Sequence, residues 1–311
     1  MSSTTLVSVV ICTRNRPDLI GNAVASVLAN DYPTFDVLVV DQSTDDRTGE
    51  IVRGLGGDHA NLRYLHTARA GLSRAYNIGI RETSGELLAF TDDDCIAPTG
   101  WLTSVANAFA AEADGELLYG QVQVPAVLAD RADDVPTLDI QNPWKLNRQR
   151  PFLLYGMGAN FAARRSLFRR IGLFDEVLGG GGPLKSSQDF DLQYRAYVGG
   201  ATVLFRPEVT IDHYGIRSPE QWTGTNRAYG TGDGAFWAKH IRCGDAYALS
   251  LLGQHLGRTA VREVLHRVGL RRRANSRVDY LRGVWAGIRG SFAFAVDRRA
   301  RMYLNPEAAG R

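Results

Sequence analysis

Short apolar runs and helical stretches alternate along the first 125 residues, and this alternation constrains the fold more than any other feature. The opening run, Leu6–Thr13, is rich in Val and Ile throughout, as expected of a strand buried on both faces. Similar runs predict strands at Phe35–Val40, Asn61–His66, Glu86–Thr91 and Leu117–Val124. The helical stretches between them are Pro17–Leu28, Thr48–Leu55, Gly71–Glu82 and Pro98–Ala111. Strands joined through single helices need crossover connections, so the pattern predicts an α/β domain of the nucleotide-binding kind with a largely parallel sheet.

The alternation weakens beyond residue 124 and ends near residue 215, which indicates the domain boundaries. Residues 125–151 form a polar connection with four prolines. The elements expected after it are a strand at Tyr155–Ala163, helices at Arg164–Ile171 and Ser187–Val198, and a strand at Ala201–Phe205. We therefore expect one domain over residues 1–216, with halves at about 1–124 and 125–216, and a helical region over 217–311.

Two glycine-rich segments are expected to interrupt regular structure. Leu178–Pro183 contains four consecutive glycines, which impose little restriction on the backbone, and is expected to be a mobile loop. Tyr229–Trp237 has glycines at three alternate positions and is expected to form a turn or the start of a helix.

The formal net charge of +3 is the sum of two regions of opposite sign. Residues 1–216 hold 19 basic and 26 acidic side chains, whereas residues 217–311 hold 17 and 7. Arg267–Arg277 contains five arginines, and the aromatic residues that follow are Trp285, Phe292 and Phe294. Arginine together with Trp and Phe on a helix suits an anionic membrane surface, so peripheral membrane contact is one expectation. The alternatives are contact with nucleic acid, a solvated surface, or an amphipathic helix packed on the preceding domain.

The sequence predicts a protein of the reducing cytoplasm. Its three cysteines, at positions 12, 95 and 243, are odd in number and too scattered for a disulfide framework. The N-terminus lacks the basic segment and the small-residue cleavage site of a secretory signal. The late apolar segment Leu281–Val296 carries Arg282 and Arg289, so it is not expected to span a membrane. A peripheral position on the inner face of the cell membrane remains compatible with the basic tail.

Three consecutive carboxylates, Asp92, Asp93 and Asp94, follow the strand at Glu86–Thr91. In open α/β sheets ligands gather at the carboxyl ends of strands, and adjacent carboxylates repel one another unless a cation compensates. Their hard oxygen atoms suit Mg²⁺ or Mn²⁺, which bind through one or two carboxylates together with substrate phosphates. Asp92 and Asp94 point to the same side if the segment stays extended. The alternative is a solvated acidic turn that caps the next helix.

Asp41 ends the second strand at the equivalent position, where a carboxylate can accept from a ribose hydroxyl or a base. Arg14 and Arg16 follow the first strand, and Arg74 begins a helix close by in the expected fold. Guanidinium groups at this sheet edge suit diphosphate or base contacts, although each arginine could equally be an ordinary surface residue.

The second half of the domain holds further candidates. Asp189 and Asp191 lie at a helix start behind the glycine loop, where a carboxylate can cap the helix or act as a general base. His213 ends a short strand. A lone histidine is an ordinary structural residue, yet a neutral imidazole is also a credible third ligand for a divalent cation.

Taken in order, these segments resemble the family 2 glycosyltransferases with the GT-A fold, over about residues 6–215. The opening strand Val-Ser-Val-Val-Ile-Cys-Thr-Arg-Asn-Arg-Pro and the second strand Val-Leu-Val-Val-Asp-Gln-Ser-Thr-Asp-Asp are similar to those of the family. Gly-Leu-Ser-Arg-Ala-Tyr-Asn-Ile-Gly-Ile and Phe-Thr-Asp-Asp-Asp resemble its helix and its DXD metal motif. Gly-Ala-Asn-Phe, Ile-Gly-Leu-Phe-Asp-Glu, Gln-Asp-Phe-Asp-Leu and His213 follow in the same order as in the family.

The resemblance implies a metal-dependent, inverting glycosyltransferase with a GT-A catalytic domain over residues 1–216. It would move a sugar from a UDP-, dTDP- or GDP-linked donor to a hydroxyl of a glycan, lipid-linked or small-molecule acceptor. Residues 1–124 would bind the nucleotide sugar and residues 125–216 the acceptor. The implied donor contacts are Thr13, Arg14, Asp41, Arg74, Asp92 and Asp93. The implied Mn²⁺ or Mg²⁺ ligands are Asp92, Asp94 and His213. Asp189 would be the general base, and the residues expected to support the site or contact the acceptor are Gly158, Asn160, Gln188 and Asp191.

Two positions depart from the family pattern. Gln188 stands where the family usually has Glu, and Tyr76 stands where it often has Arg, so Arg74 would take over that contact. The competing interpretations are a nucleotidyltransferase on a related sheet and an inactive scaffold whose basic tail binds membrane or nucleic acid. A nucleotidyltransferase needs a glycine-rich phosphate loop and a lysine after the first strand, where this chain has Cys12–Pro17. The intact carboxylate set argues against an inactive scaffold, and no nucleic-acid partner is expected.

Overall fold

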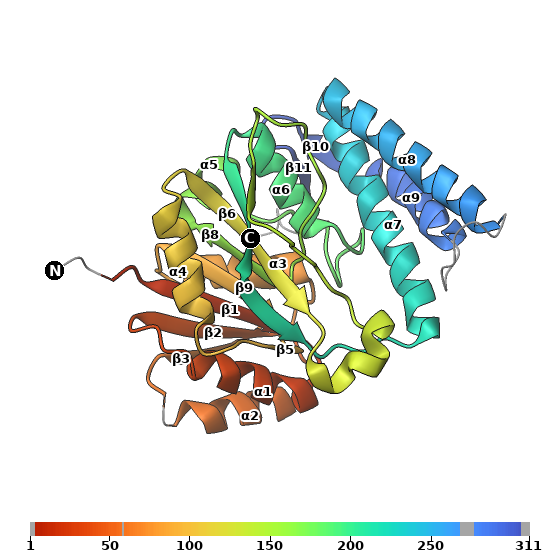
Figure 1. Cartoon of the computed structure of the whole chain (residues 1–311). Coiled ribbons are helices and arrows are strands. Elements are labelled where there is room, and N and C mark those ends of the chain that lie inside the picture. The colour runs from red at the N-terminus through yellow and green to blue at the C-terminus, as the bar shows by residue number, and fades with distance from the viewer. Residues whose placement is uncertain (1–3, 58, 268–276, 306–311) are drawn as a thin grey trace. The chain divides into compact units, whose positions relative to one another are not determined.

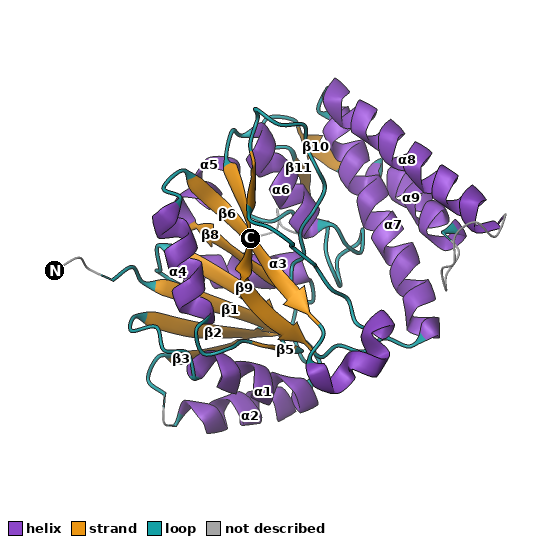
Figure 2. Cartoon of the chain, viewed as in Figure 1, coloured by secondary structure: helices purple, strands orange, loops and turns teal. Residues whose placement is uncertain are grey.

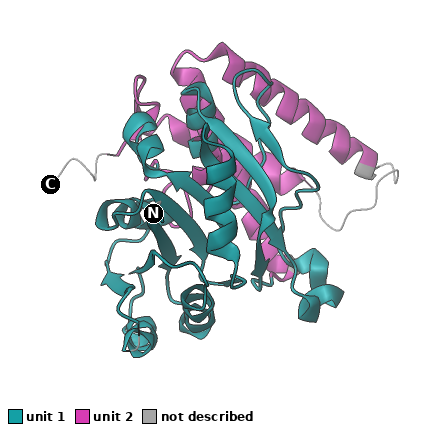
Figure 3. Ribbon diagram, turned by 60° about the vertical axis from the view of Figure 1, so that its left-hand side comes forward, with its two compact units in different colours: residues 1–174, 192–216 teal, residues 175–191, 217–311 magenta. Residues whose placement is uncertain are grey.

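The computed structural model describes residues 4–57, 59–267 and 277–305 (Figure 1). The chain divides into two compact units, coloured separately in Figure 3. Unit 1 comprises Met1–Phe174 and Leu192–Ile216, and unit 2 comprises Asp175–Asp191 and Arg217–Arg311. The boundary falls inside helix α6 (Gln188–Val198), so Asp189 belongs to unit 2. Most of the arginine-rich stretch Arg267–Arg277, namely residues 268–276, lies outside the described residues.

Unit 1 is built around one mixed sheet flanked by helices (Figure 1). The described strands are β1 (Val7–Thr13), β2 (Phe35–Asp41), β3 (Leu62–His66), β4 (Leu87–Asp92), β5 (Cys95–Ile96), β6 (Gly115–Gln123), β7 (Trp144–Leu146), β8 (Asn160–Arg164) and β9 (Thr202–His213). Their order in the sheet is β3-β2-β1-β4-β8-β6-β9-β5, with β7 paired to β9. Strands β1 to β4 pair in parallel, as do β6 and β9, whereas β8 runs antiparallel between β4 and β6. The predicted α/β fold with a mostly parallel sheet is confirmed.

The helices of unit 1 connect the strands and bury one apolar face each. They are α1 (Pro17–Leu28), α2 (Arg47–Gly56), α3 (Leu72–Glu82), α4 (Trp101–Ala111) and α5 (Arg165–Ile171). In α1 the buried residues Ile20, Val24 and Val27 recur at helical spacing, so they share one face. Helix α3 approaches β1 so closely that a Cβ added at Gly79 would lie 2.4 Å from Cγ1 of Val10, which explains the glycine there.

Two expectations for the middle of the chain differ from the structure. The strand expected over Tyr155–Ala163 begins only at Asn160, the first residue of β8. The polar connection over residues 125–151 is not wholly irregular, because it holds a 3-10 segment, η1 (Ala126–Asp134), and the short strand β7. Short segments such as these form too few local contacts to leave a periodic pattern in the sequence.

Strand β9 is longer than the sequence indicates. The apolar run ends at Phe205, but the strand continues to His213. Its pairing with β6 skips residues 207–209, which form a bulge at Pro207, and then resumes. Because the bulge interrupts the apolar pattern, the sequence suggests two short strands, Ala201–Phe205 and one that ends at His213, where the structure has a single strand.

Unit 2 is mainly helical, as the sequence predicts for the C-terminal region (Figure 2). Its described elements after α6 are α7 (Pro219–Arg242), α8 (Ala246–Arg267), α9 (Val278–Ser291) and a hairpin of β10 (Ala295–Asp297) and β11 (Met302–Leu304). Val177, Leu178, Leu184, Ala235 and Tyr303 form a buried apolar cluster. Within the described part of the chain, no helix has the length and apolar character needed to cross a membrane.

Glycines let α7 and α9 pack backbone against backbone. A Cβ at Gly230 or Gly234 of α7 would lie 2.0 Å from a carbonyl oxygen of α9. A Cβ at Gly283 or Gly287 of α9 would lie 2.2 or 1.9 Å from a carbonyl oxygen of α7. Residues four apart share one helix face, so each pair of glycines forms a flat contact strip. The expectation of a turn or helix start over Tyr229–Trp237 is therefore wrong, because the segment lies in the middle of α7.

Candidate active site

The carboxyl ends of β1, β2 and β4 meet at one edge of the sheet in unit 1. Thr13 is in register with Asp41, and Cys12 with Asp92. Because these strands are parallel neighbours, the residues that follow them emerge at the same edge. Arg14, which follows β1 directly, is exposed there. The sheet thus gathers the strand-end residues that the sequence singled out.

Asp93, the middle residue of the acidic triplet, turns into the protein. Its side chain accepts a hydrogen bond from Oγ1 of Thr13 at 2.7 Å and pairs with Nη1 of Arg16 at 2.5 Å. Burial raises the pKa of Asp93, and the charge of Arg16 opposes that shift. The same guanidinium lies 3.1 Å from Oδ2 of Asp94. Asp93 and Arg16 therefore tie the loop after β1 to the loop after β4.

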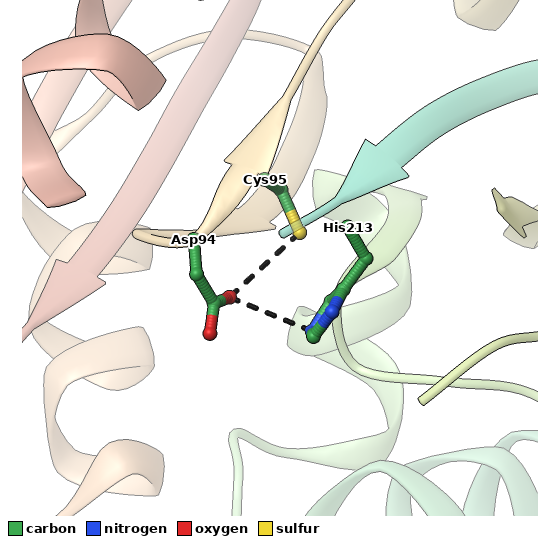
Figure 4. A group of neighbouring side chains, drawn as sticks. All are labelled: Asp94, Cys95 and His213. Atoms are coloured by element: carbon green, nitrogen blue, oxygen red, sulfur yellow. Dashed lines mark hydrogen bonds and ion pairs between the residues drawn. The ribbon is translucent and has the colours of Figure 1, made fainter. Parts of the chain in front are cut away.

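Asp94 faces His213, which the second half of β9 carries to this edge (Figure 4). Oδ1 of Asp94 lies 3.5 Å from Nε2 of His213, and both side chains are buried. The backbone fixes the pair, because Cys95 of β5 is in register with His213 and the amide of Tyr214 donates to the carbonyl of Asp94. The amide of Gly215 donates to Nδ1 of His213 at 3.2 Å, which orients the imidazole. One carboxylate and one imidazole thus meet at a single point.

This donor set fits a hard divalent cation. Ligand atoms of Asp94, Cys95 and His213 all lie within 4.8 Å of one another. Burial and the neighbouring Asp92 and Asp94 raise the pKa of the Cys95 thiol, which disfavours a metal-binding thiolate. A carboxylate and an imidazole leave coordination positions for phosphate oxygens and water, as Mg²⁺ and Mn²⁺ prefer at nucleotide sites. Asp92, also expected as a ligand, is partly exposed and lies outside this group of atoms.

Asp41 is fully buried at the end of β2. Its Oδ1 accepts from the amide of Ser43, and its Oδ2 accepts from the hydroxyl of Tyr64, both at 2.8 Å. Burial and the bond to Asp41 raise the pKa of Tyr64, so the phenol stays a donor. The next residue, Gln42, holds the loop before α3, where its Oε1 accepts from the amide of Gly71 at 2.9 Å. Asp41 and Gln42 together shape this edge of the sheet.

Helix α3 carries the position at which this chain departs from the family pattern. Tyr76 is fully buried, with its ring 5.2 Å from that of Phe90, so it is a core residue. Arg74 lies two residues earlier and is partly exposed. The side chain of Asn77 donates to the carbonyl of Phe174 at 2.9 Å and accepts from its amide at 2.8 Å. These two hydrogen bonds tie the helix motif to the Leu-Phe-Asp segment.

Asn160 holds the loop before β8 against three other elements. Its Nδ2 donates to the carbonyls of Gln121 and Val209 at 2.8 Å, and its Oδ1 accepts from Nε1 of Trp101 at 3.1 Å. The residue is 1% exposed. Nearby Gly158 presents its carbonyl 3.5 Å from the hydroxyl of Tyr76, and is partly exposed.

The carboxylates of α6 differ sharply in their surroundings within unit 2. Asp189 is partly exposed, and its Oδ1 accepts from the amide of the next residue at 2.9 Å. Asp191 is fully buried, with its Oδ1 2.6 Å from Nζ of Lys239 and 2.9 Å from Nε2 of His240. Burial lowers the pKa of His240 to about 4, so its imidazole is neutral at neutral pH, and the salt bridge of Asp191 is the one with Lys239. Gln188, between the glycine loop and Asp189, is buried.

Sequence reasoning missed most of the partners that hold these residues. Gln42 and Tyr64 carried no signal beyond their nearness to Asp41 and to a strand. Lys239 binds Asp175 at 2.7 Å as well as Asp191, and only the two carboxylates stood in motifs that drew attention. Lys239 and His240 lie about 40 residues beyond the end of α6, in a region read as a basic tail, so no local pattern could link them to it.

Comparisons with known proteins agree with this fold. The sequence model of glycosyl transferase family 2 matches residues 8–172, just over half of the chain. The uncharacterized glycosyltransferase YibD of Escherichia coli strain K12 is 30% identical over 115 residues, which cover 37% of this chain and 33% of YibD. The validoxylamine A glucosyltransferase of Streptomyces hygroscopicus subsp. jinggangensis is 26% identical over 247 residues, which cover 70% of this chain and 56% of the relative. The chain therefore spans between a third and somewhat over half of these relatives.

Solved structures show the same architecture. The mannosyltransferase PcManGT from Pyrobaculum calidifontis, in complex with GDP-Man and Mn²⁺, aligns with a TM-score of 0.61 at 18% identity, covering 94% of this chain and 87% of that one. TarS of S. aureus, residues 1–349, aligns with a TM-score of 0.54 at 23% identity, covering 73% and 65%. At such identities the likeness establishes the fold, which is of the GT-A type. With the family match, it follows that the chain belongs to glycosyl transferase family 2.

Proposed function

We propose that the protein is a metal-dependent, inverting glycosyltransferase that uses a nucleoside-diphosphate sugar and transfers the sugar to an acceptor hydroxyl. The pairing of Asp94 with His213 at the carboxyl end of β4 is the observation that carries this proposal. Membership of glycosyl transferase family 2 supports the transfer of a sugar and gives no support to the nucleotidyltransferase alternative. The fold neighbours add weight, since one was solved with GDP-Man and Mn²⁺ and TarS was solved with UDP and with UDP-GlcNAc.

The donor would be held at the sheet edge of unit 1. Asp94 and His213, with Asp92 beside them, are the proposed ligands of Mn²⁺ or Mg²⁺. A bound cation would supply positive charge against the nucleoside diphosphate as it leaves. Arg14 and Arg74 are the proposed guanidinium partners of the diphosphate or the base. Asp41, Thr13 and Asp93, which are buried and hydrogen bonded, would shape this surface from behind.

Asp189 is the proposed general base. A carboxylate that removes the proton from the acceptor hydroxyl makes the oxygen a better nucleophile. A single displacement at the anomeric carbon then inverts its configuration. Asp191 is fully buried and paired with Lys239, which favours its supporting role over contact with the acceptor. The proposed acceptor is a glycan, a lipid-linked molecule or a small molecule, as the family resemblance implies.

The experiment is a donor screen on the full chain. Release of nucleotide from UDP-, dTDP- and GDP-sugars is measured with Mn²⁺, with Mg²⁺ and with EDTA. Asp94→Ala should lower turnover by about 100-fold or more, because the cation loses its carboxylate. Asp189→Asn should lower kcat by about 100-fold and leave the affinity for UDP or GDP with Mn²⁺ unchanged. Asp45→Asn, at an exposed carboxylate after β2, is the matched control and should be silent. If a donor is found and neither Asp94→Ala nor Asp189→Asn slows its turnover, the site assignment is wrong.

A second element of the proposal is peripheral membrane contact through α9. The buried face of α9 packs on α7, whereas Trp285 and Phe292 are 62% and 69% exposed. Arg282 and Arg289 are exposed at helical spacing from these aromatic residues, so all four lie on one face. Aromatic side chains flanked by arginine suit the headgroup region of an anionic bilayer, and residues 217–311 are strongly basic.

Co-sedimentation with vesicles tests this contact. The full chain should pellet with vesicles that contain phosphatidylglycerol and should stay in solution with phosphatidylcholine vesicles at the same salt concentration. Trp285→Ala combined with Phe292→Ala should weaken pelleting several-fold, because each aromatic side chain loses apolar burial. Leu249→Ala, at an exposed residue of α8, is the control. Equal pelleting of the wild type and the double variant would exclude α9 as the membrane contact.

A further inference from the structure

The turn that carries Asp189 has an unusual backbone. Lys185 and Ser187 adopt positive φ angles of 71° and 67°, although neither is glycine. Each such residue costs about 1 kcal/mol or more and persists only where surrounding contacts over-determine it. The contacts that hold this turn in unit 2 therefore also set the direction in which α6 begins.

Helix α7 supplies those contacts at the start of the turn. The hydroxyl of Ser187 donates to Oδ1 of Asp233 at 2.6 Å, and both side chains are buried. The hydroxyl of Ser186 donates to the carbonyl of Ala228 at 3.0 Å. A Cβ at Gly232 would lie 2.5 Å from the carbonyl carbon of Ser186, so the turn rests directly on the backbone of α7.

Asp233 is itself held by the two other long helices of unit 2. Its Oδ2 accepts from the hydroxyl of Tyr280 in α9 at 2.6 Å. Nε2 of His255 in α8 lies 2.6 Å from the same hydroxyl. Tyrosine has one proton to donate, and it goes to Asp233, so the imidazole donates to the tyrosine oxygen in this network. A chain of hydrogen bonds thus runs from α8 through α9 and α7 to Ser187.

Helix α7 also holds the far end of the same turn. The amide of Asp191 donates to the carbonyl of Ser187 at 2.9 Å, which closes the first turn of α6. The carboxylate of Asp191 binds Lys239 and His240, which both lie about two turns further along α7 than Asp233. Asp189 lies midway between Ser187 and Asp191, and both of its flanks are anchored to one helix.

We propose that Asp233 is a positioning residue for Asp189 and acts through the hydroxyl of Ser187. This inference rests on the proposed role of Asp189 as general base. Loss of the Ser187–Asp233 bond frees the strained backbone before α6, while Lys239 and His240 still hold Asp191. The base then samples several orientations, and misplacement of a catalytic group by about 1 Å can cost up to about 100-fold in rate.

The test measures motion and turnover on the same full-length variants. In Asp233→Asn and Ser187→Ala, amide hydrogens of residues 185–191 should exchange about 10-fold faster or more, with α7, α8 and α9 unchanged. The kcat with the donor found in the screen should fall about 10-fold to 100-fold, while the affinity for UDP or GDP with Mn²⁺ stays the same. Asp279→Asn removes a partly exposed carboxylate of α9 and is the matched control. Should Asp233→Asn loosen the helices, Ser187→Ala, which deletes only one hydroxyl, carries the test.

The outcomes separate this inference from the function on which it rests. If Asp189→Asn abolishes transfer but Asp233→Asn and Ser187→Ala change neither exchange nor kcat, Asp233 does not position the base. If Asp189→Asn leaves transfer intact, the proposed base is wrong and the positioning role is lost with it. A fall in nucleotide affinity that matches the fall in kcat would also overturn the inference, because it would indicate general destabilisation.

Discussion

Replacement of Gly234 by alanine should destabilise unit 2, although alanine is the better helix former. Gly234 lies in α7, and an added Cβ would lie 2.0 Å from the carbonyl oxygen of Val284 in α9. Cβ atoms in proteins essentially never lie within 3.0 Å of a heavy atom outside their own residue and its chain neighbours. The neighbour is backbone and cannot rotate away, so the two helices must separate by about 1 Å at this point.

The magnitude follows from two opposed contributions. Overpacking of a close-packed contact costs about 1–3 kcal/mol, and a rigid backbone neighbour places this site near the upper end. Alanine recovers about 1 kcal/mol of helix propensity relative to glycine. We therefore expect Gly234→Ala to lower the free energy of unfolding by about 2 kcal/mol. Gly224 lies in the same helix with nothing within 4 Å, so Gly224→Ala should instead raise it by up to about 1 kcal/mol.

Urea unfolding followed by circular dichroism measures both variants against the wild type. Gly234→Ala should lower the urea concentration at the midpoint and Gly224→Ala should raise it, while the m-value, the slope of the free energy against urea concentration, stays unchanged. Hydrogen exchange of α9 should locate the loss of stability of Gly234→Ala at the α7–α9 contact. Equal midpoint shifts in the two variants would refute the backbone-to-backbone packing of these helices.

Three further predictions concern stability. Asn160→Ala should lower the free energy of unfolding by about 3 kcal/mol in urea titrations, because two carbonyls and the indole of Trp101 lose a buried partner; a loss below about 1 kcal/mol would contradict the network. Burial raises the pKa of Asp233 to about 6. Its contribution to the free energy of unfolding is therefore full below about pH 4 and falls by about 3 kcal/mol as pH rises through 6. The pKa of His240 is lowered to about 4, so its contribution to the free energy of unfolding rises between about pH 4 and 6.5. Asp233→Asn removes the opposing fall, so stability should rise more steeply with pH in the variant than in the wild type. Equal slopes in the two proteins would contradict this. Tyr76→Arg, which restores a residue common in the family, should cost several kcal/mol by thermal denaturation because it buries an unpaired charge; unchanged stability would show that the core adapts.

Much of the candidate site could be located from the strand ends. Asp41 and the acidic triplet were found because an apolar run followed by carboxylates is a local pattern. The sequence could not predict which carboxylate of the triplet turns inward. Thr13 lies 80 residues from Asp93 and becomes its hydrogen-bond partner only when β1 and β4 pair. His213 was placed at the end of a short strand, but the sequence did not show that this strand continues from the run Ala201–Phe205 through a bulge, or that it brings His213 to Asp94.

The tail shows the opposite balance between sequence and structure. Its excess of arginine predicted a basic helical region, and α7 to α9 are helical. Its glycines were read as breaks in the chain because glycine is a poor helix former in isolation. In the structure they are the contact surface of α7 and α9, and the gain from close packing outweighs the local cost.

The sequence by itself determined the alternation of strands and helices, the family, and the strand-end carboxylates. These depend on residues a few positions apart, whose periodicity and type are visible along the chain. The tertiary structure decided which carboxylate is buried, which one faces an imidazole, and how the turn with Asp189 is anchored to α7. Those facts depend on contacts between segments that are distant in the sequence, and burial and hydrogen-bond partners exist only once the segments have packed.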